Sequence, residues 1–388
     1  MKSKWTYRPL GELVSFASGG TPSKKRDGYW GGTIPWISAK TLKTENIDTS
    51  DLFITEEGLK AGSKIAPKGS ILLLTRGSGL FNGIPIARVE KDVAFNQDIK
   101  CLDTYGEVEN EFIFYWLLSQ KDYLMAKVGV TGIGAGKFDL DFLQKLMIPI
   151  PSERERKSIV GFANSISEKI RCNAKVNDNL LDQAQTLYKQ HFPYSVQDDL
   201  PDGWRIGTVG EIIEIHDSKR IPLSGADRMK MEKKIYPYYG AASLMDYVDN
   251  YIFDGKYLLL GEDGTVVDDA GYPILQYVWG QFWVNNHAHI LTGRLGFNVE
   301  SLYMLFKQTP VKSIVTGAVQ PKISQANLRS VQVVIPPEHN LKEYNDLVEP
   351  LFSLLRANEE ECKSLAALRD TLLPKLMSGE IDVSAVQL

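Results

Sequence analysis

Apolar positions along the chain follow two patterns. Short runs rich in branched and aromatic residues predict strands at residues 70–75, 84–89 and 146–150, between clusters of Gly, Pro, Asn and Asp. A longer apolar-periodic stretch predicts a helix near residues 111–127. The same order recurs later, with predicted strands at residues 257–260, 274–277 and 330–335 and a helix near residues 299–308. The sequence therefore predicts an α/β (α+β) protein with mixed β-sheet and short helices in each half.

Each half is followed by a long amphipathic helix, predicted at residues 152–191 and 338–377. Pro193 closes the first helix, whereas Pro350 and Pro374 are expected to kink the second. About forty residues at a rise of 1.5 Å span roughly 60 Å, which exceeds what a domain of this size needs to cover its core. The length thus favours two helices that pair with each other.

The two helices share a heptad position. Every seventh residue gives Ile159, Ile166, Asn173, Leu180 and Leu187 in the first helix, and Tyr344, Leu351, Asn358, Leu365 and Leu372 in the second. One interpretation is that each helix only covers the core of its own domain; the favoured one is an antiparallel coiled coil. Because a polar residue in such a seam can fix the register, we hypothesise that Asn173 and Asn358 set the register of the pair.

The two halves are copies of one module. The segment from Gly129 to Lys137 recurs from Ile314 to Lys322, an offset of 185 residues that persists through the last predicted strand and the long helix. Earlier landmarks repeat with offsets that drift between 186 and 202: Leu72 corresponds to Leu258, Asn96 to Asn285 and Pro35 to Pro237. Drifting offsets are typical of loops that differ in length between copies.

Composition limits the class of protein. The 388 residues favour two to three domains, and the 43% apolar and 24% charged fractions are those of a globular protein. Three cysteines, Cys101, Cys172 and Cys362, are odd in number and too widely spaced for a metal knuckle, which fits a reducing compartment. No signal-peptide pattern or apolar span appears, so we expect a cytoplasmic protein without a membrane partner.

Charge is unevenly distributed. The net charge is −4, yet residues 1–43 hold eight Lys or Arg against two acidic residues, and residues 219–234 hold six against two. Residues 338–388 are acidic, with ten acidic residues against five basic ones. Basic segments near the start of each half indicate a surface for a polyanion, although solvated charged faces are common.

The most enzyme-like string is the segment from Thr131 to Lys137, which resembles a phosphate-binding loop. Such a loop needs Gly where Thr131 stands and Ser or Thr where Phe138 follows the lysine. The second copy keeps the Thr-Gly and the lysine, Lys322, but loses the other glycines. What both copies share is a turn of small residues and a cation.

Metal and nucleophile motifs are also weak. His287 and His289 alternate on one face of a strand, but the first copy has Asp98 and Lys100 in their places, which argues against a shared zinc site. Neither a Gly-x-Ser-x-Gly elbow nor an Asp/Asn-Pro-Pro-aromatic motif occurs. We therefore expect no catalysis and no metal or other cofactor in this chain.

The tandem modules, each closed by a strand that ends in Ile-Pro and followed by a long helix, resemble the specificity subunit of type I restriction-modification systems. The resemblance covers essentially the whole chain. It rests on residues 5–13, residues 203–212, Ile148 to Glu155, Val315 to Lys322 and, most specifically, Leu368 to Glu380. The first helix lacks that last ending and reads Thr186 to Phe192 instead.

The resemblance implies an architecture and partners. Target-recognition domains at residues 1–151 and 200–337 would read the halves of a bipartite, asymmetric double-stranded DNA site in a pseudo-two-fold arrangement. Spacer helices at residues 152–199, which include a linker, and 338–379 would hold two methyltransferase subunits and leave a tail at 380–388. Restriction subunits would complete the complex. S-adenosylmethionine, ATP and Mg²⁺ would then belong to those partners.

Base-reading residues are expected on loops that differ between the copies, with cations for phosphates and amides or rings for base edges. In the first domain the candidates are Ser18, Thr21, Lys24, Lys25, Arg26, Lys40, Arg76, Ser78, Asn82 and Lys137. In the second they are Lys219, Arg220, Tyr238, Tyr239, Asn285, Asn286, His287, Gln320 and Lys322. Two alternatives stay open: an interaction scaffold without a role on DNA, and an enzyme with an unrecognised, duplicated active site.

Overall fold

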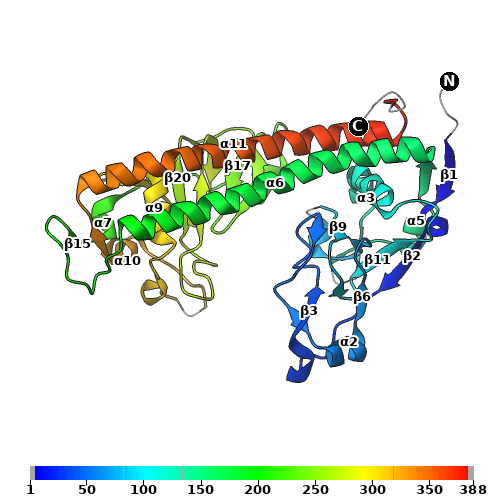
Figure 1. The fold of residues 1–388 in the computed structure, drawn as a ribbon, viewed down its shortest axis with the longest axis horizontal. Helices are drawn as coiled ribbons and strands as arrows, with labels where there is room; N and C mark the ends of the chain where they lie inside the picture. The colour runs from blue at the N-terminus through cyan, green and yellow to red at the C-terminus, as the bar shows by residue number, and fades with distance from the viewer. Residues whose placement is uncertain (1–4, 82, 133, 318, 383–388) are drawn as a thin grey trace. The chain divides into compact units, whose positions relative to one another are not determined.

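The protein forms two compact units in a computed structural model that describes residues 5–81, 83–132, 134–317 and 319–382. The first unit comprises Met1–Cys172 together with Glu361–Leu388, and the second comprises Asn173–Glu360. Each combines β-sheets and short helices with part of both long helices (Figure 1). The predicted mixed α/β class, with two tandem modules and long helices, is confirmed.

The long helices α6 (Glu153–His191) and α11 (Glu338–Met377) match the two predicted helices to within one residue. Helix α11 continues as one helix through Pro350 and Pro374. Each helix contributes one half to each unit. A helix can contribute to both units because its apolar stripe is continuous. In α6, for example, buried seam residues occur in both halves of the helix, such as Ile159 in the first and Leu180 in the second.

The two helices are antiparallel within each unit. In the first unit Lys169 Nζ lies 3.1 Å from Glu361 Oε2, and further toward the start of α6 the Arg369 guanidinium lies 3.4 Å from Ser167 Oγ. Residue numbers at the contacts thus rise in one helix as they fall in the other. The predicted antiparallel pairing is confirmed for the part of the pair inside this unit.

The seam of the second unit carries a buried pair of amides. Asn358 Nδ2 donates to Asn177 Oδ1 at 2.8 Å, and Asn177 Nδ2 donates to the Leu355 carbonyl at 3.2 Å. Further along, Tyr344 Oη donates to the carbonyl of Ala184 at 3.1 Å, which gives the same antiparallel direction. Asn358 therefore bonds to an asparagine that sequence reasoning did not single out. Asn173, one turn earlier, is also buried, and its role in the register stays a prediction.

The first unit consists of a five-stranded sheet of order β2-β11-β7-β9-β4, a four-stranded sheet of order β5-β3-β10-β6, and two smaller sheets, β1-β14 and β12-β13-β8. Its strands are β1 (Thr6–Pro9), β2 (Val14–Ser18), β3 (Trp30–Ile37), β4 (Asn46–Ile47), β5 (Phe53–Ile54), β6 (Lys64–Ala66), β7 (Ile71–Leu74), β8 (Arg76–Gly77), β9 (Ile86–Val89), β10 (Val93–Phe95), β11 (Ile99–Thr104), β12 (Gly129–Val130), β13 (Gly136–Lys137) and β14 (Met147–Ile150). Its short helices are α1 (Leu10–Leu13), α2 (Glu56–Gly62), α3 (Asn110–Ser119), α4 (Lys121–Met125) and α5 (Leu140–Gln144).

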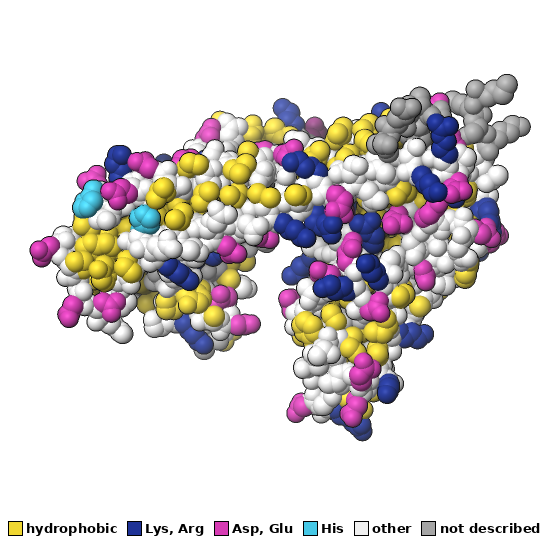
Figure 2. Space-filling model, viewed as in Figure 1, with side chains coloured by type: hydrophobic (Ala, Val, Ile, Leu, Met, Phe, Trp, Pro, Cys, Tyr) yellow, Lys and Arg dark blue, Asp and Glu magenta, His cyan; other side chains and the backbone are white. Residues whose placement is uncertain are grey.

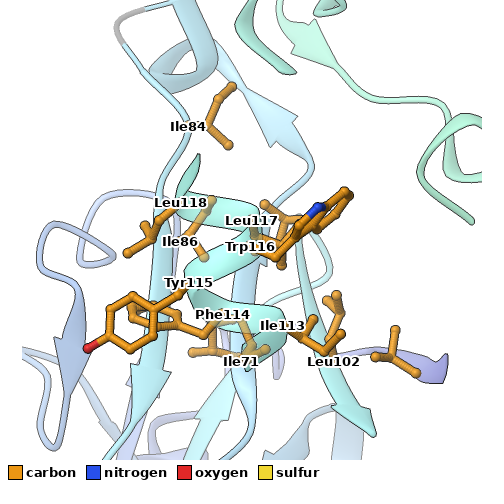
Figure 3. Close-up of a cluster of buried hydrophobic side chains, with 14 of the residues drawn as sticks. Ile71, Ile84, Ile86, Leu102, Ile113, Phe114, Tyr115, Trp116, Leu117 and Leu118 are labelled. Atoms are coloured by element: carbon orange, nitrogen blue, oxygen red, sulfur yellow. The ribbon is translucent and has the colours of Figure 1, made fainter. Parts of the chain in front are cut away.

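Helix α3 covers the central strands of the five-stranded sheet. Phe112 to Leu118 are all buried, and they pack with Ile71, Ile86 and Leu102 from β7, β9 and β11 (Figure 3). The predicted helix over residues 111–127 is split into α3 and α4 at Gln120. A helix that is apolar on all sides belongs in a core, which is where α3 lies.

The second unit repeats this plan with fewer strands. Its sheets have the orders β16-β23-β20-β21, β18-β17-β22-β19 and β15-β24. The strands are β15 (Arg205–Thr208), β16 (Ile213–Ile215), β17 (Tyr236–Tyr239), β18 (Leu244–Val248), β19 (Phe253–Asp254), β20 (Tyr257–Gly261), β21 (Leu275–Val278), β22 (Gln281–Val284), β23 (Ala288–Gly293) and β24 (Gln332–Ile335), and the helices are α7 (Val209–Ile212), α8 (Gly225–Met229), α9 (Val299–Phe306) and α10 (Gln325–Ser330).

The duplication extends to strand pairing. Strands β3 and β10 pair in parallel in the first unit, and β17 and β22 do so in the second, while β2-β11-β7-β9 has its counterpart in β16-β23-β20-β21. The repeat inferred from sequence offsets is therefore a repeat of topology. Among the described residues, none of the helices has the length and apolar character that crossing a bilayer requires.

Candidate nucleic-acid interface

Two predicted DNA-contacting cations of the first unit lie directly opposite each other. Arg76 on β8 pairs with Lys137 on β13 in antiparallel register, and both residues are exposed. Cross-strand partners project from the same face of a sheet, so the two positive groups are neighbours. Like charges in this position are destabilising. Within the described ranges neither side chain forms an ion pair, so the site holds positive charge that a bound anion would neutralise.

Close approach of the two strands explains two of the glycines at this site, Gly136 and Gly77. A Cβ on Gly136 would lie 2.9 Å from the Cβ of Leu80 and 3.1 Å from the carbonyl oxygen of Gly77. Gly77 itself has a φ of 139°, which only glycine adopts without strain. Gly136 and Gly77 therefore serve strand packing, whereas a Cβ on Gly132 or Gly134 would meet no atom within 4 Å.

The other candidates of the first unit lie in varied surroundings. Lys24, Lys25, Lys40 and Ser78 are exposed, whereas Asn82 lies outside the described residues. The remaining three make local contacts: Ser18 Oγ accepts from Lys100 Nζ, Thr21 Oγ1 donates to Gln97 Oε1 at 2.7 Å, and Arg26 Nη1 donates to Tyr29 Oη at 2.8 Å. Figure 2 shows lysine and arginine side chains gathered on this unit beneath helix α6. Contact of these candidates with DNA stays a prediction.

The second unit buries two of its candidates and holds a third in ion pairs. Tyr238 is 1% exposed and Asn285 is 4% exposed, so neither presents its side chain to solvent. Arg220 is held by Glu262 at 2.5 Å and by Asp217 at 3.3 Å. These three side chains serve the fold of the unit. The burial of an aromatic or amide residue in a loop-rich segment cannot be recognised from the sequence alone, and these residues were therefore predicted as DNA contacts.

The remaining candidates of the second unit are accessible. Lys219, Asn286, Gln320 and Lys322 are exposed, and Tyr239 and His287 are partly exposed. Lys322 differs from its counterpart Lys137 because its Nζ lies 3.2 Å from Glu262 Oε1. The second unit thus partly neutralises the cation that the first unit leaves without an ion pair among its described residues.

A buried ionic network lies behind Lys322. His289 is 0% exposed; its Nδ1 lies 2.6 Å from Asp217 Oδ2 and its Nε2 lies 2.8 Å from the Ile323 carbonyl. Both ring nitrogens of His289 therefore face an oxygen within hydrogen-bond distance. Burial alone would raise the pKa of Asp217, but the bond from His289 and the nearby Arg220 hold it below its ordinary value.

The same network resembles a metal site in composition but not in charge. One ligand atom each from Asp217, Glu262 and His289 lie within 4.8 Å of one another. However, Arg220 and Lys322 already pair with these carboxylates, and both imidazole nitrogens lie at hydrogen-bond distance from other protein oxygens. Burial would raise the pKa of Glu262, yet the bond from Arg220 keeps it lowered. The charges are balanced by side chains, so we assign the cluster to the structure of the unit.

Comparisons of this chain with known proteins agree on one family. A model of the family described as "Type I restriction modification DNA specificity domain" matches residues 2–181 and 201–366. The chain is 24% identical to the type I restriction enzyme MjaIX specificity subunit of Methanocaldococcus jannaschii, over 98% of this chain and 94% of that protein. It is 23% identical to the EcoprrI specificity subunit of Escherichia coli, over 85% and 83% respectively.

A solved structure shows the same fold. The S subunit of a type I restriction-modification system from M. genitalium aligns with a TM-score of 0.52 at 18% identity, covering 96% of each chain. Both tandem modules and the long helices are included in that coverage.

Proposed function

This chain belongs to the type I restriction modification DNA specificity family, and we propose that each of its two units reads one half of a bipartite, asymmetric double-stranded DNA site. Whole-length similarity to specificity subunits supports the assignment. The observation within the molecule that carries it is the Arg76–Lys137 pair, in which two exposed cations face each other on adjacent strands. Such a pair suits the phosphates or the acceptor edge of a base.

In this proposal the chain performs no catalysis. Its long helices act as spacer and dock two methyltransferase subunits, and restriction subunits complete the assembly. S-adenosylmethionine, ATP and Mg²⁺ are bound by those partners. Half-sites about one helical turn apart, roughly 34 Å, require a rigid spacer, and two continuous helices of 39 and 40 residues are suited to that role.

The test is DNA binding by the chain assembled with its methyltransferase subunits. Fluorescence anisotropy of a labelled duplex that carries the methylated motif is measured over a salt series, with Arg76→Gln and Lys137→Gln. Each variant should lower affinity by about 1–3 kcal/mol if it removes a base contact, or reduce the salt slope by about one if it removes a phosphate contact.

Lys68→Gln is the matched control. Lys68 is an exposed lysine of the same unit, but it precedes β7 whereas Arg76 follows that strand. It should change affinity little. Equal affinity of all variants with an unchanged salt slope would contradict the assigned interface, and failure of the assembled complex to bind any duplex would favour an interaction scaffold without a role on DNA.

A further inference from the structure

Equivalent main-chain hydrogen bonds within each unit show which residues of the two units correspond around the Arg76–Lys137 pair. In the first unit the Thr75 amide donates to the Asp98 carbonyl at 2.9 Å. In the second the Glu262 amide donates to the His287 carbonyl at 2.8 Å. Thr75 therefore corresponds to Glu262 and Asp98 to His287.

Two further bonds support this alignment. The Asp98 amide donates to Asn96 Oδ1 at 3.2 Å, and the His287 amide donates to Asn285 Oδ1 at 2.8 Å, so the same asparagine turn precedes both residues. On the other side of the site the Phe138 amide donates to the Thr75 carbonyl at 2.9 Å. Its counterpart is the Ile323 amide, which donates to the Glu262 carbonyl at 2.8 Å.

The next residue on each strand carries the opposite charge. Arg76 follows Thr75 and lies across from Lys137. Asp263 follows Glu262 and forms an antiparallel bridge with Lys322. One backbone position, opposite one lysine, thus holds a guanidinium in the first unit and a carboxylate in the second.

Arg76 and Asp263 differ in hydrogen-bonding capacity as well as in charge. Asp263 Oδ1 lies 2.5 Å from His287 Nδ1, and the side chains are 18% and 44% exposed. Within the part of the chain that the structure describes, Asp263 Oδ2 has no hydrogen-bond donor from a side chain. The second unit therefore offers a partly exposed carboxylate that its histidine orients, whereas Arg76 offers only donors.

We propose that this position determines base specificity in each unit: Arg76 reads guanine, and Asp263, oriented by His287, reads the amino group of cytosine. An arginine fork donates to the two major-groove acceptors of guanine, and a carboxylate accepts from the cytosine amino group. A carboxylate that faced phosphates would instead be repelled, so its presence opposite Lys322 favours a base edge. The inference rests on the proposed reading of DNA by both units.

The experiment selects sequences with the assembled complex. A duplex library with both half-sites randomised is bound and sequenced for the wild type and for Arg76→Gln, Arg76→Lys and Asp263→Asn. Either Arg76 variant should lose guanine preference at one position by about tenfold, and Arg76→Lys should keep the salt slope because the charge remains.

Asp263→Asn should relax cytosine preference at one position of the other half-site and favour adenine, which an amide reads through paired bonds. Lys68→Gln and Asp269→Asn, at exposed positions of the two units, are controls that should keep the wild-type motif. If the variants weaken binding equally for all sequences and keep the motif, this inference is wrong and the proposed function stands. If the wild-type complex selects no sequence at all, both are wrong.

Discussion

The buried Asn177–Asn358 pair gives a prediction about the helix pair that can be worked out from its contacts. Truncation of Asn358 to alanine removes the 2.8 Å bond to Asn177 Oδ1 and leaves that acceptor buried, at a site where the two residues are 8% and 9% exposed. A lost bond is worth about 1 kcal/mol, and an unsatisfied buried group adds about 1–3 kcal/mol. We expect Asn358→Ala to lower the free energy of unfolding of the second unit by about 2–4 kcal/mol.

A double-mutant cycle isolates the pair. Once Asn177 is alanine, truncation of Asn358 leaves no orphaned partner on α6, so the second change should cost less and the coupling should be about 1–2 kcal/mol. Urea unfolding followed by far-UV circular dichroism measures each corner. Asn179→Ala, at an exposed position two residues away, should stay within about 0.5 kcal/mol of the wild type. Strictly additive effects would refute the proposed coupling.

The hypothesis that Asn173 and Asn358 set the register of the helix pair gives a separate prediction. Asn173→Leu combined with Asn358→Leu removes the polar seam residues that are expected to fix the alignment of α6 and α11. We expect the variant complex to lose its single preferred gap between half-sites. An unchanged sequence preference and gap would show that these asparagines do not set the register.

Three further outcomes follow from the first unit. Arg369→Met should lower the free energy of unfolding of the first unit by about 2 kcal/mol, measured by urea unfolding. Arg369 is 5% exposed, and its guanidinium binds the Glu45 carboxylate at 2.5 and 3.0 Å. The loss is moderate because Glu45 is 30% exposed and keeps its ion pair with Lys121. Burial would raise the pKa of Glu45, but ion pairs with Lys121 and Arg369 hold it below the ordinary value. The stabilisation by these ion pairs is therefore present above the ordinary carboxyl pKa and is lost as the pH falls through the pKa of the folded state. The difference in free energy of unfolding between pH 7 and pH 3 should be smaller in Arg369→Met than in the wild type. Gly136→Ala should separate β13 from β8 and weaken duplex binding more than an alanine at exposed Gly132 does, as anisotropy would report.

Much of the architecture follows from local patterns. The long helices were predicted to within one residue because their apolar stripe runs through about eleven turns. The core strands β7 and β20 were found as buried apolar runs. Strands of two residues, such as β8, were not predicted because a pair like Arg76–Gly77 has no periodicity to detect.

The site is only partly visible in the sequence. Arg76 and Lys137 were nominated separately, but their pairing depends on strand register between residues far apart in the chain. Asp263 was not nominated for a related reason. The repeated Leu run implies an offset of 186 residues, which makes Glu262 the equivalent of Arg76. The main-chain hydrogen bonds instead make Asp263 its equivalent. A one-residue difference changes which charge faces the ligand, and only tertiary contacts resolve it.

The most direct test of the central claim is a map of methylated bases in the DNA of a host that carries this chain with its methyltransferase subunits. The proposed function predicts a two-part motif with a fixed gap, and Arg76→Gln should make one position degenerate in one half only. A single uninterrupted motif, or a motif that changes in both halves with Arg76→Gln, would contradict the claim that two separate units each read one half-site.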